Sequence, residues 1–305
     1  MKVFVAGASG AVGIPIVKEL IKQGHEVAAM TRSVRGTQQL QVLGAAKVMS
    51  IDAFDYKQVK EALQQVAPEA VIDMLTFLPK NLADMLKAFP GDRKLRLEGG
   101  GHLFAASTAS GVSRYLQQSC GFWIKPKSGE RLGTEDDPFE LHATPNIASG
   151  SDMYRQVEER VLSDPKTEGI ALRFGFFYGQ GTWYAEDGSA AEMARRQHLP
   201  IVGEGSAVNS FVHVDDAAKA TVATLTVEPG VYDIVDDDPV AVSTWLPAFA
   251  ASVGAPPPPQ ISEEAGVAAA GPDAAFYHNS LSGASNVKAK KIFGFEPRPL
   301  EWLTR

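Results

Sequence analysis

The chain has 305 residues, of which 45% are hydrophobic and 21% charged, so it can bury a large core in one elaborated domain or two closely joined ones. Its net charge of −7, without any basic block, argues against nucleic acid as a partner. The single cysteine, Cys120, excludes an intramolecular disulfide framework and fits a reducing compartment, so we expect a cytoplasmic protein. No apolar run reaches the roughly twenty residues of a membrane span, and we expect no membrane partner.

The first predicted elements are a strand, a glycine-rich turn and a helix. An apolar run over residues 3–6 predicts the buried strand, and residues 14–23 predict an amphipathic helix. Glycines three residues apart allow a tight turn, bring backbone amides close to phosphate oxygens and let the helix pack on the strand, while the helix N-terminus attracts anions. The segment therefore predicts a dinucleotide pyrophosphate site. Its residues are Gly7, Ser9, Gly10, Ala11, Val12 and Gly13.

The second predicted strand, residues 26–30, ends about twenty residues after the glycines, where an NAD site usually offers a carboxylate to the ribose hydroxyls. This chain has Thr31 and Arg32 there, followed by Ser33 and Arg35. A carboxylate repels a 2′-phosphate, whereas an arginine binds it through two parallel hydrogen bonds. The sequence therefore predicts NADP(H) as the coenzyme.

The following segments alternate between strand and helix, as in a parallel sheet covered on both faces. Strands are predicted at residues 46–51, 70–75, 114–118 and 169–174, and helices at 56–65, 98–109 and 151–162, with 81–97 left unassigned. The fold class is thus α/β, with a Rossmann-type doubly wound parallel sheet. Because ligands bind beyond the carboxyl ends of such strands, Asp52, Leu75, Thr76 and Ser119 are expected to face one crevice.

Four motifs in the same order along the chain resemble those of extended short-chain dehydrogenases/reductases of the NAD(P)-dependent epimerase/dehydratase type. They are residues 7–13, 171–179, 210–216 and 285–295. The resemblance implies an NADP-binding Rossmann region over 1–180, completed by a strand and a helix from about 208–235. It also implies an interleaved, mainly substrate-binding region over 181–305.

The same resemblance implies roles for residues at the strand ends. Asp52 would contact adenine, Leu75 and Thr76 would line the ribose and nicotinamide, and Phe174 and Phe176 would border the nicotinamide.

The catalytic signature departs from the family pattern of a Ser or Thr after the fifth strand and a Tyr-x-x-x-Lys pair on the next helix. Ser119 fits the first position, with Cys120 as the alternative if the register slips by one. One register for the pair gives Tyr154 with Glu158 in place of lysine. The other gives Ser151 in place of tyrosine and Arg155 in place of lysine.

Electrostatics separates these substitutions, since a carboxylate disfavours a neighbouring phenolate and a guanidinium favours it. Arg155 could keep the positive charge and donate to ribose hydroxyls, although an arginine cannot join a proton relay. Ser151, Tyr154 and Arg155 lie at helical offsets that can share one face, so Tyr154 could supply its hydroxyl one turn from the usual place. We therefore expect Ser119 and Tyr154 to be the catalytic residues.

Hydride transfer tolerates an altered acid/base pair better than multistep chemistry does, because the coenzyme carries the reactive hydrogen. The sequence therefore predicts an NADPH-dependent reductase of a carbonyl in a medium-sized, apolar small molecule. An epimerase/dehydratase with tightly bound NAD(P) and a non-catalytic NADP(H) sensor are the alternatives, and a homodimer is left open. The aromatic clusters 182–184 and 276–278 are candidate pocket walls, and the histidine spacing predicts no metal site.

Overall fold

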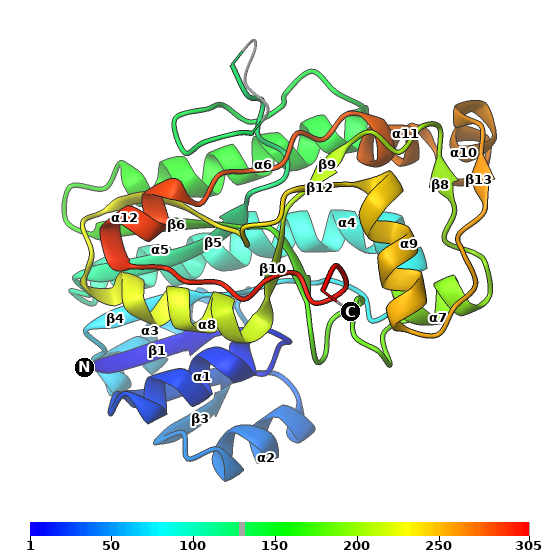
Figure 1. Cartoon of the computed structure of the whole chain (residues 1–305). Coiled ribbons are helices and arrows are strands. Elements are labelled where there is room, and N and C mark those ends of the chain that lie inside the picture. Colours follow the sequence, from blue (N-terminus) through cyan, green and yellow to red (C-terminus); the bar gives the residue numbers. More distant parts are fainter. Residues whose placement is uncertain (128–131, 305) are drawn as a thin grey trace.

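The computed structural model describes residues 1–127 and 132–304. Its centre is a seven-stranded sheet in which every neighbouring pair is parallel (Figure 1). In spatial order the strands are β11 (Gly230–Ile234), β6 (Glu168–Phe174), β5 (Arg114–Cys120), β4 (Ala70–Asp73), β1 (Lys2–Ala6), β2 (Glu26–Thr31) and β3 (Lys47–Ser50). The order reverses direction between β1 and β4, which confirms the Rossmann-type doubly wound α/β fold.

Alternating side chains of β1 enter two different cores, as the two-residue period of a strand requires. Val3 and Val5 belong to a core with α1 (Gly13–Lys22) and α8 (Val214–Ala223). Phe4 and Ala6 belong to the core on the opposite face. The helices contributing to that face are α3 (Tyr56–Val66), α5 (Gly100–Ala109) and α6 (Pro145–Leu162). The apolar run that predicted a strand is thus buried on both sides.

The segment left unassigned in the sequence is helical. A 3₁₀ turn at Leu82–Asp84 leads into α4 (Met85–Lys94), and a π-helical turn at Leu95–Gly99 connects α4 to α5. Pro90 lies inside α4 and glycines and charges follow it, which obscures the helical period. Helix α2 (Val34–Val42) was also not predicted, and it begins at the N-cap residue Ser33.

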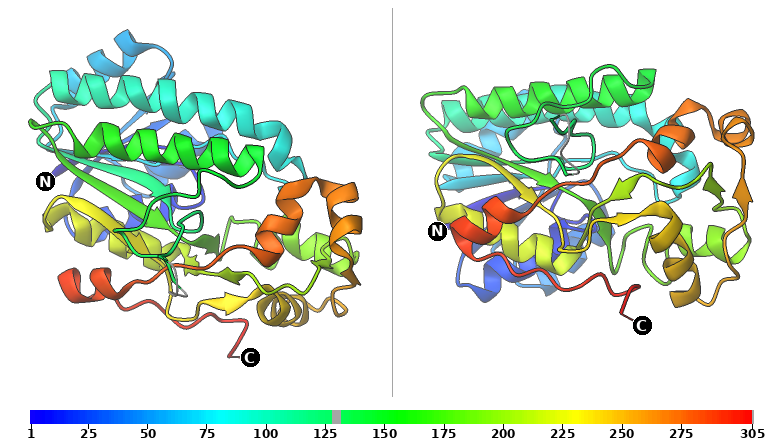
Figure 2. Two further views of the ribbon diagram at one scale, coloured as in Figure 1. Left: turned by 90° about the horizontal axis from the view of Figure 1, so that it is seen from above. Right: turned by 45° about the horizontal axis from the view of Figure 1, so that its top comes forward.

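Most of the remaining elements lie beyond the carboxyl ends of the main strands, whereas α12 (Val287–Phe293) packs against β11 (Figures 1 and 2). Three two-stranded ladders join β7 (Phe176–Tyr178) to β10 (Phe211–His213), β9 (Val208–Asn209) to β12 (Val240–Ala241), and β8 (Ile201–Val202) to β13 (Gln260–Ile261). The helices at this end are α7 (Ser189–Arg195), α9 (Val242–Ser252), α10 (Glu263–Ala270) and α11 (Pro272–Asn279). They place a second, largely aromatic core over the end of the sheet where ligands bind in this fold.

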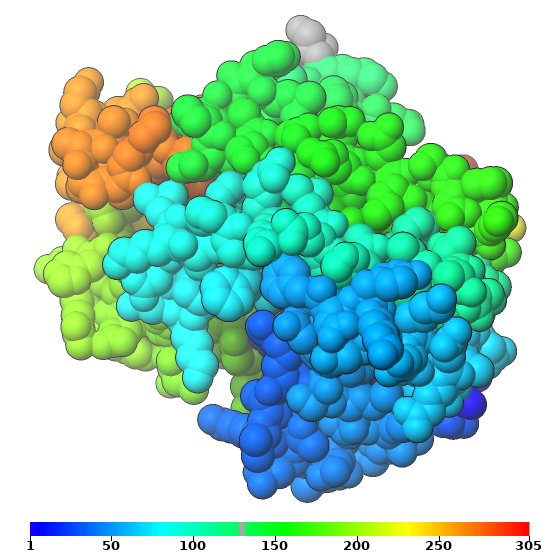
Figure 3. All heavy atoms as spheres, turned by 180° about the vertical axis from the view of Figure 1, so that it is seen from behind, coloured from blue at the N-terminus to red at the C-terminus, as the bar shows by residue number. Residues whose placement is uncertain are grey.

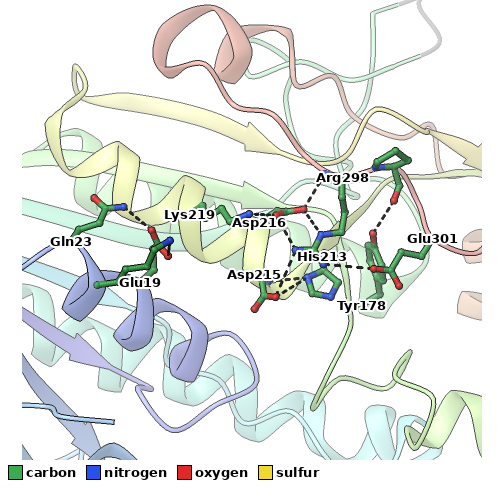
Figure 4. A network of polar contacts seen from close by, with 11 residues as sticks. Glu19, Gln23, Tyr178, His213, Asp215, Asp216, Lys219, Arg298 and Glu301 are labelled. Carbon is green, nitrogen blue, oxygen red and sulfur yellow. Dashed lines mark hydrogen bonds and ion pairs between the residues drawn. The ribbon is translucent and has the colours of Figure 1, made fainter.

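The C-terminal segment, residues 298–302, contacts both α8 and the second core. Arg298 donates to the Asp216 carboxylate over 2.8 Å, next to His213 and Asp215 at the start of the helix (Figure 4). Burial acts to raise the pKa of Asp216, but hydrogen bonds from Arg298 hold the pKa below its ordinary value. Trp302 follows and packs 4.8 Å from Phe249, measured between ring centroids. Among the described residues, no helix is long and apolar enough to cross a membrane.

Candidate active site

The glycine-rich turn packs so closely against the end of β4 that side chains are excluded. Gly7 has a φ of 75°, and a Cβ atom added to it would lie 2.3 Å from the Met74 carbonyl oxygen. A Cβ atom at Gly13 would lie 2.2 Å from the carbonyl oxygen of Gly7. Helix α1 begins at Gly13, so the turn delivers a helix N-terminus to the edge where β1 and β4 diverge.

A crevice of about 170 Å³ opens at this switch point. It lies where the N-terminal turns approach the segment after β4, the blue and cyan regions that border one another in Figure 3. Its lining residues are Gly7, Ser9, Gly10, Met30, Thr31, Arg32, Asp52, Ala53, Met74, Leu75, Thr76 and Leu95. Most residues expected to contact a dinucleotide therefore surround one cavity. The closely packed glycine turn and the adjoining helix N-terminus fit a pyrophosphate.

The end of β2 is built from hydroxyl groups and an arginine. The Thr31 and Ser9 hydroxyls lie 2.7 Å apart. Ser33 caps α2 by accepting a hydrogen bond of 2.9 Å from the Gly36 amide. Arg32 is exposed between these two features and lines the crevice. A phosphate on the adenosine ribose would thus meet a guanidinium beside the amino end of a helix.

Ser119 does not face this crevice. Its hydroxyl is 2.5 Å from a Glu158 carboxylate oxygen, and Arg173 forms two hydrogen bonds of 2.8 Å with the same carboxylate. All three residues are buried. The expectation that Ser119 points beyond the strand end is therefore wrong. Its hydroxyl instead binds the Glu158–Arg173 ion pair between β5 and α6. The geometry also shows that Arg173 neutralises the carboxylate that replaces the family lysine in one register.

Cys120, the next residue of β5, belongs to the second core, which also contains Trp123 and Tyr154. Burial raises the pKa of the Cys120 thiol to about 12, so the thiol remains protonated at neutral pH. Cys120, the alternative to Ser119 in the sequence analysis, thus lies in the same core as Tyr154 and offers a neutral thiol in place of a hydroxyl.

Tyr154 lies in an aromatic setting on the inner face of α6. Its ring centroid is 5.8 Å from that of Trp123 and 5.1 Å from the guanidinium carbon of Arg96. Burial raises the pKa of the phenol, and the positive charge of Arg96 partly opposes that rise. The phenol is therefore protonated at neutral pH and can act as a donor. Ser151, one turn earlier, is fully buried and its hydroxyl finds no hydrogen-bond partner in the described part of the chain.

Arg155, the next residue of α6, points toward solvent. Its side chain is 47% exposed and forms ion pairs of 2.8 Å with Asp152 and 3.0 Å with Glu159. Successive helical residues differ by about 100°, so Tyr154 and Arg155 cannot both face inward. Arg155 is therefore not part of the proposed coenzyme site.

The two phenylalanines assigned to the nicotinamide border occupy different places. Phe174 is 1% exposed and lies in the main core on the α1 side of the sheet. Phe176 stacks on Phe122, with ring centroids 4.1 Å apart, and lies 6.3 Å from Tyr277. Only Phe176 therefore borders the aromatic core that contains Tyr154.

Sequence reasoning missed Arg96, the positively charged residue in contact with the Tyr154 ring. Arg96 comes from the π-helical turn between α4 and α5, and its Nε atom donates to Asp92 over 2.8 Å. Both side chains are nearly inaccessible, at 2% and 3% exposure. The only available signal was an Asp and an Arg four residues apart, and it could not be used while the segment had no assigned structure.

A second cavity, of about 290 Å³, lies next to this cluster and shares Trp123 with it. Phe122, Trp123 and Phe276 supply aromatic walls, and Lys125 and Glu140 stand at the polar side. Phe276 was expected to form a pocket wall. From the other predicted aromatic cluster, Tyr184 is part of the packed core and Trp183 donates to the Pro79 carbonyl over 2.8 Å.

Comparisons with known proteins agree with this geometry. Residues 3–234 match the NAD dependent epimerase/dehydratase family. The chain is 34% identical over 304 residues to a 3-diazoavenalumate denitrifying reductase of a Streptomyces species, covering 99% of this chain and 98% of the relative. It is 28% identical over 268 residues to the 2-alkyl-3-oxoalkanoate reductase of Stenotrophomonas maltophilia, covering 84% of this chain and 77% of the relative.

Solved structures share the fold at lower identity. A UDP-glucose 4-epimerase of Thermotoga maritima, solved with UDP-glucose, has a TM-score of 0.77 at 18% identity and covers 99% of this chain and 95% of its own. The Thermus thermophilus enzyme of the same name, solved with NAD, has a TM-score of 0.72 at 23% identity, covering 98% and 94%. From its sequence match and its fold, the chain belongs to the NAD-dependent epimerase/dehydratase family and is an NAD(P)-dependent enzyme of the short-chain dehydrogenase/reductase type.

Proposed function

We propose that the protein is an NADPH-dependent reductase that transfers hydride to a medium-sized, largely apolar substrate with an aromatic ring. The observation that carries this proposal is the position of Tyr154, a protonated phenol among aromatic side chains and beside Arg96. Such a site offers one proton donor and a water-poor surface, and reduction by a nicotinamide needs little more.

In this proposal the coenzyme lies across the switch point. The amides of Ala11 to Gly13 would face the pyrophosphate, because the Gly10 amide already donates to the Gly7 carbonyl. Arg32 would bind the 2′-phosphate, and Leu75 and Thr76 would line the ribose. Residues 1–180, with the strand and helix from about 208–235, form the coenzyme region, and residues 181–305 mainly hold the substrate. Bound NADPH supplies the hydride.

The chain's own residues then orient the acceptor and handle its charge. Phe122, Phe176 and Trp123 would hold the planar substrate and exclude water. For a carbonyl acceptor, the Tyr154 hydroxyl would give its proton to the oxygen as hydride reaches the carbon.

A diazo group is the second candidate acceptor. The 34% identity to a denitrifying reductase over 99% of the chain favours it. When hydride adds to an aromatic carbon that bears a diazonium group (N₂⁺), the C–N bond breaks, N₂ leaves with the bonding electrons and a C–H bond forms without any proton transfer. This reaction forms no alkoxide, so the Tyr-x-x-x-Lys pair, which is incomplete here, is not needed.

The test measures NADPH oxidation by the purified protein with matched aromatic aldehydes, ketones and diazo compounds, using wild type and Tyr154→Phe. We expect turnover of at least one class. For a carbonyl, Tyr154→Phe should lower kcat by ~10²-fold, because proton donation typically contributes that much. For a diazo compound the loss should stay within a few fold.

Two other outcomes would replace the proposal. Exchange or loss of a carbon-bound hydrogen without net NADPH oxidation would indicate an epimerase or dehydratase. Tight binding that distinguishes NADPH from NADP⁺, with no turnover across the panel, would indicate a sensor.

A further inference from the structure

We propose that Arg96 is the charged hydrogen-bond donor of the reaction site, whose Nη1 group binds an oxygen anion of the aromatic substrate, such as a phenolate or an enolate. In this role Arg96 supplies from the α4–α5 junction the positive charge that the family pattern places on α6 as a lysine. The inference rests on the proposed function and names the chemical group that the site recognises.

The backbone around Arg96 explains how a cation reaches the interior. The π-helical turn Leu95–Gly99 widens the helix and displaces carbonyl oxygens from their usual partners. Arg160 of α6 donates to two of them, the carbonyls of Arg96 at 3.4 Å and Leu97 at 3.2 Å. The distorted turn is thus supported from outside, and π-helical turns of this kind occur frequently at functional sites.

Two connections place Arg96 behind the residues that line the coenzyme crevice. Leu95, its neighbour in sequence, lines the crevice together with Leu75 and Thr76. Asp92, its ion-pair partner, accepts a hydrogen bond of 2.6 Å from the amide of Phe77, the residue after Thr76. The same short segment therefore borders the predicted ribose site and holds the Arg96–Asp92 pair.

The Arg96 guanidinium is hydrogen-bonded at Nε, whereas its Nη1 group is buried without an acceptor among the described residues. Nε donates to Asp92, and the plane lies over the Tyr154 ring. Nη1 is buried and has no acceptor anywhere in residues 1–127 and 132–304. A buried guanidinium N–H without an acceptor is unfavourable, so a ligand that brings a negatively charged oxygen would complete the site.

Other charged groups nearby already have hydrogen-bond or ion-pair partners. Glu158 is paired with Arg173, and Arg160 donates to Gln117 at 3.0 Å as well as to the carbonyls. Asp73 is buried, accepts from the Tyr115 hydroxyl over 2.9 Å, and burial raises its pKa. The buried Nε atoms of Arg93 and Arg160 also have no acceptor among the described residues, but of these arginines Arg96 is the one whose guanidinium lies over the Tyr154 ring.

The experiment uses 4-nitrophenol as probe, bound to the protein with NADP⁺, so that no hydride can be transferred. Visible absorbance reports whether the bound probe is ionised. In wild type we expect its apparent pKa to fall by ~1–2 units on binding, as for an acid beside an opposite charge. Arg96→Met should abolish this shift and weaken binding ~10-fold or more, while Arg96→Lys should retain part of the shift.

The control is Arg155→Met, which removes an exposed arginine and should leave the shift unchanged. Calorimetric titration with NADP⁺ should give similar affinities for all variants, which shows that Arg96→Met is folded. If wild type fails to lower the pKa of the probe, or if Arg96→Met lowers it equally, the inference is overturned. Absence of NADPH oxidation by any acceptor would instead overturn the proposed function, and the two failures are distinguishable.

Discussion

The Ser119 hydroxyl donates to the Glu158 carboxylate over 2.5 Å, and the same carboxylate is held by Arg173. This relationship joins β5, α6 and β6 in a buried network. Ser119 and Glu158, which stand at catalytic positions of the family pattern, thus form a structural contact that holds α6, the helix that carries Tyr154, against β5. The reacting groups of this chain must therefore come from one helical turn earlier on α6, near the end of β5, where Cys120, Tyr154 and Arg96 lie.

Glu158→Ala should destabilise the protein by about 3–5 kcal/mol, because it leaves the Arg173 charge buried without its partner. Ser119→Ala should cost only about 1 kcal/mol and retain NADPH oxidation within a few fold, since it removes one hydrogen bond. Urea denaturation with parallel rate measurements checks both. A Ser119→Ala protein of normal stability but without activity would restore Ser119 to the catalytic site.

Arg32→Gln should weaken NADPH binding by ~10–100-fold, because a charge-assisted bond to the 2′-phosphate is lost. NADH binding should change less than threefold, because NADH has no such phosphate. Titration calorimetry with both coenzymes checks this, and Arg35→Gln serves as a neighbouring exposed control. Equal weakening of both coenzymes by Arg32→Gln would contradict the assignment.

Asp236→Asn should raise stability at pH 8 more than at pH 5. Burial raises the pKa of Asp236 from 3.8 to about 7 in the folded protein. The folded state therefore binds more protons than the unfolded chain, and stability falls as the pH rises from about 4 to 7. The amide removes this loss, with a gain of up to about 4 kcal/mol above pH 7, at 1.36 kcal/mol per pKa unit.

Thermal unfolding across this pH range measures the effect of Asp236→Asn. Asp237→Asn is the matched control, since burial acts to raise the pKa of Asp237 but hydrogen bonds from Asn286 and Lys290 lower it overall. The control should not gain stability with rising pH. A pH-independent effect of Asp236→Asn would show that its carboxyl is not protonated in the folded state.

Gly150→Ala should destabilise the protein by about 1–3 kcal/mol and change the fluorescence of Trp123, because overpacking forces neighbours to move. A Cβ atom at Gly150 would lie 2.2 Å from the Trp123 ring. Gly101→Ala, in helix α5, is the control, where the nearest atom is the end of the Arg160 side chain at 3.5 Å. This change should stabilise by about 0.5–1 kcal/mol. If both variants behave alike, Trp123 is not fixed against α6.

The sequence was sufficient for the strands and the glycine turn, because buried parallel strands are continuous apolar runs and the turn needs glycine. The sequence was not sufficient to predict the direction in which side chains of the candidate active site point. Ser119 and Cys120 point to opposite faces of β5, so a one-residue ambiguity in register decides which one approaches Tyr154. The prediction for Arg155 was wrong for a similar reason, because a shift of one residue along a helix turns the side chain by about 100°. Arg96 could not be found because a π-helical turn has no clear sequence period.

The most direct test of the proposed hydride transfer uses NADPH carrying deuterium at C4 of the nicotinamide, in separate 4R and 4S forms. With any acceptor that wild type turns over, we expect one form to deliver deuterium to the reduced carbon of the product and the other to deliver none. Product that contains no deuterium from either form, with hydrogen drawn from solvent or from the substrate itself, would contradict the account.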